Sequence, residues 1–151
     1  MVTGDSKNNA ISTAKELEFL NQKSKLFSLT EDSKDKLNES IRHALSSIKN
    51  IITKETPQDL RQSRISIIKQ KLSNNMMEKL KETILLVSGD SLDIIFQDTY
   101  LLSHFLFIAF LSSKIIAFSL DPMQKAILLK QVQKRFYKNP IILAIGDGIN
   151  D

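Results

Sequence analysis

Residues 83–88, Thr-Ile-Leu-Leu-Val-Ser, decide the fold class of this chain. They form a short apolar run that ends at Gly89-Asp90, and two later runs have the same form: 114–119 (KIIAFS) and 140–145 (PIILAI). Runs of this length, bounded by Gly, Asp or Pro, are typical of parallel strands that are buried on both faces. The three runs therefore predict strands of one parallel sheet.

Helical patterns lie between and before these runs. Stretches at about 91–112 and 122–137 separate the predicted strands. Strand alternating with helix indicates an α/β fold wound through right-handed crossovers. Upstream, apolar side chains recur at three- and four-residue steps and predict helices within residues 1–20, 30–54 and 56–80. Thr30 or Asp32 can cap the second of these helices.

The composition indicates one globular core. Of the 151 residues, 42% are hydrophobic and 25% are charged, and the absence of cysteine excludes disulfides and thiolate metal sites. The net charge of +4 arises in residues 21–82, where 13 Lys and Arg stand against 8 Asp and Glu. This surplus favours a solvated helix surface over a face for anionic lipid, and no aromatic interleaving supports a nucleic-acid partner. Residues 100–113 are apolar but too short for a membrane span, which needs about 20 residues.

Three of the four glycines precede an aspartate, in Gly4-Asp5, Gly89-Asp90 and Gly146-Asp147. Gly-Asp is common turn chemistry, so one pair alone says little. The second and third pairs, however, follow predicted strands, and open α/β sheets place their ligands at the carboxyl ends of their strands.

The loop 146–151, Gly-Asp-Gly-Ile-Asn-Asp, is the strongest candidate site. Glycines on both sides of Asp147 let a bulky anion or a hydrated metal come close. Asp147 and Asp151 offer the hard oxygen ligands that Mg²⁺ prefers. Asn150 adds an amide that can donate to a phosphate oxygen.

Lys125 and Thr3 are the next candidates. Asp121 can cap a helix that starts at Pro122, which places Lys125 in the first turn. A cation there opposes the helix dipole by about 0.3–1 kcal/mol, and an anion at the strand end would reverse this local electrostatics. The Thr3 hydroxyl can hydrogen-bond a phosphoryl oxygen, while Asp5 can orient a ribose or a water.

Taken in order, Thr3-Gly4-Asp5, residues 122–125 and residues 146–151 resemble the motifs of the P-type ATPases, in the haloacid dehalogenase-like superfamily. Residues 85–92 (LLVSGDSL) are similar to the Val-Ile-Asp-Gly-Lys-Ser-Leu segment of the type IV, phospholipid-translocating flippases. The resemblance implies a partial haloacid dehalogenase-like Rossmann-type sheet with a helical insertion. Residues 1–151 would be the later half of an incomplete phosphorylation domain, with the insertion over 30–81 and an α/β part over 83–151.

The resemblance also implies residue roles. Phosphate would be contacted by Thr3, Gly4 and Asn150, with Asp5 near the nucleotide and Lys125 neutralising phosphate charge. Asp147 would hold Mg²⁺, with Asp151 beside it as a second ligand or as the partner of Lys125. Positioning and charge neutralisation are the means by which phosphoryl transfer is accelerated.

A complete parent of this family would use ATP and Mg²⁺ and move phospholipid at the cytoplasmic face of a membrane, with nucleotide-binding, actuator and transmembrane domains as partners. The family's nucleophile motif, Asp-Lys-Thr-Gly-Thr, does not occur in the 151 residues, so the chain alone is expected to be a soluble, inactive fragment. Ser6 and Ser119 replace basic residues usual in flippases, which leaves a regulatory module without transport as one alternative. A basic helical binding protein is another, and a strand-rich core behind residues 83–151 would exclude it.

Overall fold

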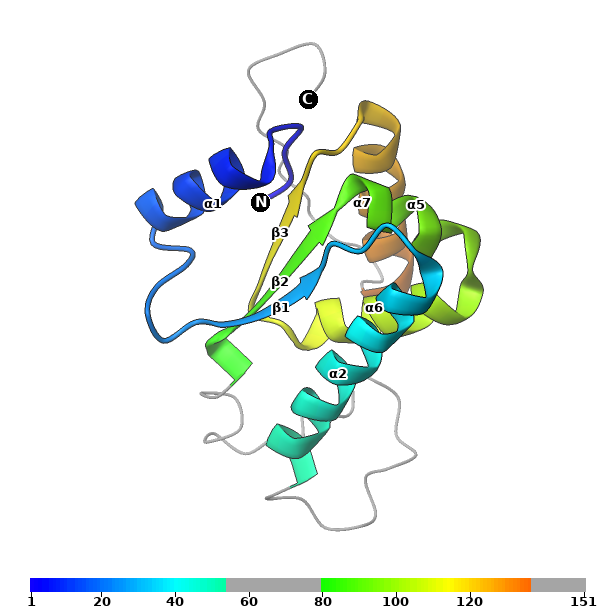
Figure 1. The fold of residues 1–151 in the computed structure, drawn as a ribbon, viewed down its shortest axis with the longest axis horizontal. Helices are drawn as coiled ribbons and strands as arrows, with labels where there is room; N and C mark the ends of the chain where they lie inside the picture. Colours follow the sequence, from blue (N-terminus) through cyan, green and yellow to red (C-terminus); the bar gives the residue numbers. More distant parts are fainter. Residues whose placement is uncertain (54–79, 137–151) are drawn as a thin grey trace.

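The computed structural model describes residues 1–53 and 80–136. Helices separate the strands along the described chain, and Figure 1 shows their arrangement. In order they are α1 (Lys7–Glu16), β1 (Lys25–Leu29), α2 (Lys34–Thr53), β2 (Thr83–Ser88), α5 (Gly89–Gln97), α6 (Thr99–Leu111), β3 (Lys114–Phe118) and α7 (Pro122–Phe136). The chain is therefore an α/β protein, as the sequence predicts.

The described strands form one parallel sheet in the order β1-β2-β3. The register pairs Phe27 with Leu85 and Leu85 with Ile115. Every residue of the central strand β2 is buried, which is the reason for its continuous apolar sequence. Beyond β3, Val2 forms an isolated parallel bridge with Ala117, so the first residues of the chain extend the sheet at that edge. This small open sheet excludes the basic helical binding protein.

Helices cover both faces of the sheet (Figure 1). On one face, Ala10 and Ala14 of α1 pack against Ile84, Leu86 and Ile116. Helices α2, α5, α6 and α7 lie on the other face, where the larger cluster of buried apolar side chains is found. The predicted apolar stripe of α2 is part of that cluster, through fully buried Leu37, Ile41 and Ile48.

Three features of the secondary structure differ from the sequence prediction: an unexpected strand, a divided helix and a shifted helix start. Strand β1 lies in a stretch for which no strand was expected, because only Phe27 and Leu29 of its five residues are buried. The helix predicted over 91–112 is two helices, since Asp98 is extended and its side chain accepts from the N–H groups of Tyr100 and Leu101 to cap α6. Helix α2 starts at Lys34, and the hydroxyl of Ser33 accepts from the Lys36 N–H, where Thr30 or Asp32 was expected to cap.

Two predicted elements, the strand over 140–145 and all but the end of the helix over 56–80, lie outside the described residues. Within residues 1–53 and 80–136, no helix is both long enough and apolar enough to cross a bilayer. The very apolar α6 instead packs inside the larger cluster, with Phe105 and Ile108 completely buried.

The ion pair between Lys34 and Asp98, 2.7 Å between Nζ and Oδ2, joins the start of α2 to the cap of α6. The hydrogen bond from Lys34 is the largest cause that lowers the pKa of Asp98 below its ordinary value of 3.8, and the Leu101 N–H adds to it. A carboxyl whose pKa is lower in the folded state stabilises the protein above the unfolded pKa, and this contribution is lost as the pH falls through the folded pKa.

We therefore predict that replacing Asp98 by Asn, which is also a good helix cap, removes a part of the free energy of unfolding that depends on pH. The difference between wild type and Asp98→Asn should be largest at neutral pH and should shrink as the pH drops below 3.8. Urea unfolding at pH values from 7 to about 2.5 measures it, with Lys34→Met as the partner control. An equal difference at both ends of this range would contradict the linkage.

Candidate functional site

Three connections meet at the carboxyl ends of β2 and β3. They are residues 3–5, residues 88–91 and residues 119–125, and we call them together the carboxyl-end cluster. Open parallel sheets bind their ligands at this edge. The cluster contains four of the residues singled out from the sequence: Thr3, Gly4, Asp5 and Lys125.

Backbone hydrogen bonds fasten residues 3–5 to the end of β3. The Thr3 N–H donates to the Ala117 carbonyl (2.9 Å), and the Leu120 N–H donates to the Thr3 carbonyl (3.1 Å). The Ser119 N–H donates to the Asp5 carbonyl at 2.8 Å. A β-carbon at Gly4 would lie 3.3 Å from the Leu120 carbonyl oxygen, so the two segments run in close contact.

The hydroxyl of Thr3 turns back toward its own loop. Its oxygen accepts a hydrogen bond from the Asp5 N–H at 3.1 Å, and this shapes the turn around Gly4. Ser119, which is bonded to the same loop, has a positive φ of 53°, and the backbone changes direction there between β3 and α7. The hydroxyl of Ser119 donates to the Asp5 carbonyl at 3.3 Å.

A reciprocal cap fixes the start of α7. The Gln124 N–H donates to Asp121 Oδ1 (2.7 Å), and the Asp121 N–H donates to Gln124 Oε1 (3.1 Å). This is the capping-box arrangement, with Gln at the third helical position. It confirms that Asp121 caps a helix that begins at Pro122, and it places Lys125 in the first turn as predicted.

Gln124 also ties α7 to α5. Its Nε2 donates to the Gly89 carbonyl (3.1 Å) and to Asp93 Oδ1 (2.7 Å), and the side chain is buried. Sequence reasoning missed Gln124, because both partners are more than 30 residues away. The Gln at the third position after a Pro-started helix was the signal that could have drawn attention to it.

Gly89 is needed where these two helices begin. A β-carbon at Gly89 would lie 2.2 Å from the Ser119 carbonyl oxygen and 2.8 Å from Gln124 Oε1. No side chain larger than hydrogen fits at these distances without movement of the backbone. Asp90, the second residue of the Gly-Asp pair, is exposed.

Serine hydroxyls extend the network toward β1. Ser88 caps α5 by accepting from the Ser91 N–H at 3.3 Å, and its own hydroxyl donates to Ser91 Oγ at 3.0 Å. The Ser91 hydroxyl donates to the carbonyl of Glu31, just after β1, at 2.7 Å. All three strand ends are therefore held by hydrogen bonds at one edge of the sheet.

Lys125 is unusual for its burial, with only 8% of the residue exposed. A buried lysine is rare unless its charge is compensated, and Lys125 does interact with another group in the folded chain. The structure thus places Lys125 in the first turn of the helix that follows β3, and it bonds residues 3–5 to the end of the same strand. Asp147, Asn150 and Asp151 lie outside the described residues. Within residues 1–53 and 80–136, no group of three or more His, Cys, Asp or Glu side chains is placed to hold a metal.

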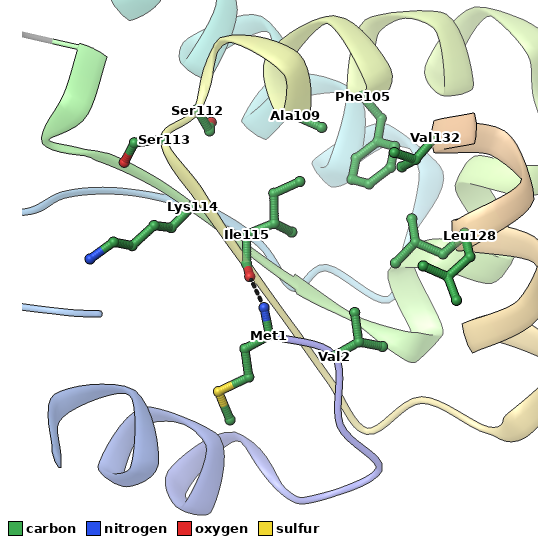
Figure 2. A pocket seen from close by; sticks show the side chains of 11 residues that line it. Met1, Val2, Phe105, Ala109, Ser112, Ser113, Lys114, Ile115, Leu128 and Val132 are labelled. Atoms are coloured by element: carbon green, nitrogen blue, oxygen red, sulfur yellow. Dashed lines mark hydrogen bonds between the residues drawn. The ribbon is translucent and has the colours of Figure 1, made fainter. Parts of the chain in front are cut away.

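A separate apolar cavity of about 280 Å³ lies between β3, α6 and α7 (Figure 2). Val2, Phe105, Leu128 and Val132 point into it, and Met1 donates from its amino group to the Ile115 carbonyl at 2.8 Å. Its lining is predominantly aliphatic and aromatic, so this cavity suits apolar groups. The carboxyl-end cluster is the better candidate for a charged ligand.

Comparison with known proteins gives partial matches. No family model matches the chain. The guanylate cyclase alpha of Plasmodium falciparum is 42% identical over 67 residues, which is 44% of this chain. The guanylate cyclase of Toxoplasma gondii is 37% identical over the same length. The matched stretch spans about 2% of each of these curated relatives.

These names contradict the assignment to the P-type ATPases. The relatives are named guanylate cyclase, so the prediction of a flippase fragment is wrong, and the flippase-like regulatory module fails with it. The motif of residues 3–5 is a short turn beside the end of β3, and such turns serve the same geometry in many α/β folds. A parallel sheet of three strands does not establish the haloacid dehalogenase-like superfamily either.

The geometry of the cluster predicts that Gly89→Ala destabilises the protein. Alanine favours a helix over glycine by up to about 1 kcal/mol, but its methyl group would collide with the Ser119 carbonyl. Overpacking of this kind costs about 1–3 kcal/mol, so urea unfolding should show a clear net loss of stability. Asp90→Ala, one position on and exposed, is the matched control and should change stability little. A Gly89→Ala protein as stable as wild type would show that the two turns are not in contact.

Proposed function

We propose that this chain is a non-catalytic α/β segment of a guanylate-cyclase-type protein, and that its carboxyl-end cluster binds a phosphate group of a nucleotide. The observation that carries the proposal is the buried Lys125 in the first turn of α7, the helix that follows β3, together with residues 3–5, which are hydrogen-bonded to the end of the same strand. The identity to two guanylate cyclases over 67 residues supports the class of the parent protein. The sheet would then be part of a larger Rossmann-like domain.

A phosphate group requires a cation and several hydrogen-bond donors. Lys125 supplies the positive charge, and because this side chain is largely shielded from water, an ion pair that it forms is stronger than at the open surface. Thr3 supplies a hydroxyl whose oxygen already accepts from the Asp5 N–H, so its proton points away from that bond. Gly4 lets a bulky anion approach the backbone, because no β-carbon covers the turn.

The Asp5 carboxylate is exposed at the rim of the cluster. It would repel a phosphate directly, but it can accept from a sugar hydroxyl or bind a bridging cation. Mg²⁺ is the cation that we propose, since nucleotides carry it on their phosphates. The sequence offers Asp147 and Asp151 as its ligands, with Asn150 as a further phosphate contact, all outside the described residues.

The names of the relatives make a guanine nucleotide the first ligand to test, and ATP the competitor to compare with it. Binding without conversion is the expected behaviour of the chain. A cyclic nucleotide formed from GTP by the purified chain would contradict the non-catalytic part of this proposal.

We predict that Lys125→Met weakens the binding of Mg²⁺-GTP by at least about tenfold. A charge-assisted hydrogen bond is worth about 1.5–3 kcal/mol, and each 1.4 kcal/mol is a factor of ten. Isothermal titration calorimetry of the whole chain measures the affinity, and Lys130→Met, an exposed lysine on the same helix, is the matched control.

Thr3→Val, which keeps the shape but removes the hydroxyl, should cause a smaller loss in the same direction. Thermal melting of each variant separates a loss of binding from a loss of fold. Equal affinities for wild type, Lys125→Met and Lys130→Met would contradict the phosphate site.

A further inference from the structure

The outer edge of β1 has no partner strand in the part of the chain that the structure describes. The Lys25 N–H donates to the Glu82 carbonyl at 2.7 Å, so the backbone groups of Lys25 face β2. In a parallel ladder alternate residues face opposite neighbours, so Phe27 and Leu29 also face β2. The N–H and C=O groups of Leu26 and Ser28 therefore point outward, away from the sheet.

This edge is accessible. Leu26 has 41% of its surface exposed, and Ser28 is exposed beside it. Between the edge and α2 lies a cavity of about 220 Å³, whose helix side is formed by Ser40, His43 and Ala44. The small side chains of Ser40 and Ala44 leave space beside β1 for a side chain of an added strand. Unpaired edges of this kind are templates for strand addition.

The charges at the two ends of β1 are opposite. Lys23 and Lys25 lie at its amino end, and Glu31 and Asp32 follow its carboxyl end. A second strand with the same charge distribution would match these ends only if it ran antiparallel. Another copy of β1 has that distribution.

We propose that the outer edge of β1 pairs with the same edge of a second copy of this chain, antiparallel and about a two-fold axis at Phe27. In this register Leu26 lies opposite Ser28 of the second copy, and each such pair exchanges two backbone hydrogen bonds. Lys25 comes near the acidic end of the second copy, and the two sheets become one. The interface is isologous, as in most homodimers.

Ser28→Pro tests the pairing with little disturbance of the fold. Proline at 28 removes an N–H that points outward and blocks an added strand, while the N–H groups that bond to β2 belong to other residues. Ser28→Ala is the matched control, since it keeps the backbone donor. Sedimentation equilibrium should show a concentration-dependent dimer for wild type and Ser28→Ala, and an association at least tenfold weaker for Ser28→Pro. Circular dichroism confirms that each variant is folded.

The absence of cysteine in the chain allows a direct test of the register. Leu26→Cys and Ser28→Cys are made separately and mixed, and a short thiol-reactive cross-linker is added. The proposed register predicts that the mixture gives more cross-linked dimer than either variant alone, because positions 26 and 28 face each other directly.

A wild-type chain that stays monomeric at every concentration up to its solubility limit would overturn the proposal. So would a dimer that Ser28→Pro leaves unchanged, or cross-linking that is as strong for each variant alone as for the mixture. An association seen only with a different protein would assign this edge to a foreign partner, which also contradicts pairing between copies. None of these results depends on whether the chain binds a nucleotide.

Discussion

The close approach of Gly89 to the carbonyl of Ser119 is the contact on which the rest of the described structure depends. It brings the turn after β2 against the turn after β3, and only a residue without a β-carbon fits there. Gln124 then holds the two turns together, since it donates to the Gly89 carbonyl and to Asp93 while its backbone N–H is bound by Asp121. The Gln124 side chain is buried, where an unpaired amide would be costly, so its bonds determine the arrangement well.

The candidate site follows from that contact. Once α7 begins at a fixed place over the sheet, Lys125 is held in its first turn and buried at the strand ends. Residues 3–5 are fastened to the same place by bonds to Ala117, Ser119 and Leu120. A ligand that binds there would meet groups already in position, and preorganised groups lose less free energy on binding than mobile ones. The cavity beside Met1 is separate from this network, and its lining is mostly apolar.

The sequence predicted most of the helices and strands whose buried residues follow a regular apolar pattern. Strand β2 has the expected bounds and α7 begins at Pro122, because a continuous apolar run and an Asp-Pro start are strong local signals. Strand β1 was missed, since an edge strand with two buried residues has a weak pattern. The break at Asp98 was missed because the apolar side chains continue through it, so only the cap marks the boundary between α5 and α6.

The site was predictable only in part. Lys125 and Thr3 could be chosen from local sequence, and the structure places both at the edge of the sheet where the strands end. Gln124 and Ser91 could not, because their partners at Gly89, Asp93 and Glu31 come from distant segments. The family assignment failed for a related reason. A few turn residues describe the geometry of a strand end, and that geometry is shared by proteins with different functions.

Backbone NMR spectra of the whole chain, recorded during titration with Mg²⁺-GTP and separately with guanosine, test the central claim most directly. If the carboxyl-end cluster binds phosphate, the amide signals of residues 3–5 and of the first turn of α7 shift together with GTP and stay in place with guanosine. The signals of α1 and β1 should not move in either titration. Shifts of equal size with guanosine, or shifts centred on the apolar cavity around Phe105 and Leu128, would contradict a phosphate site at the ends of the strands.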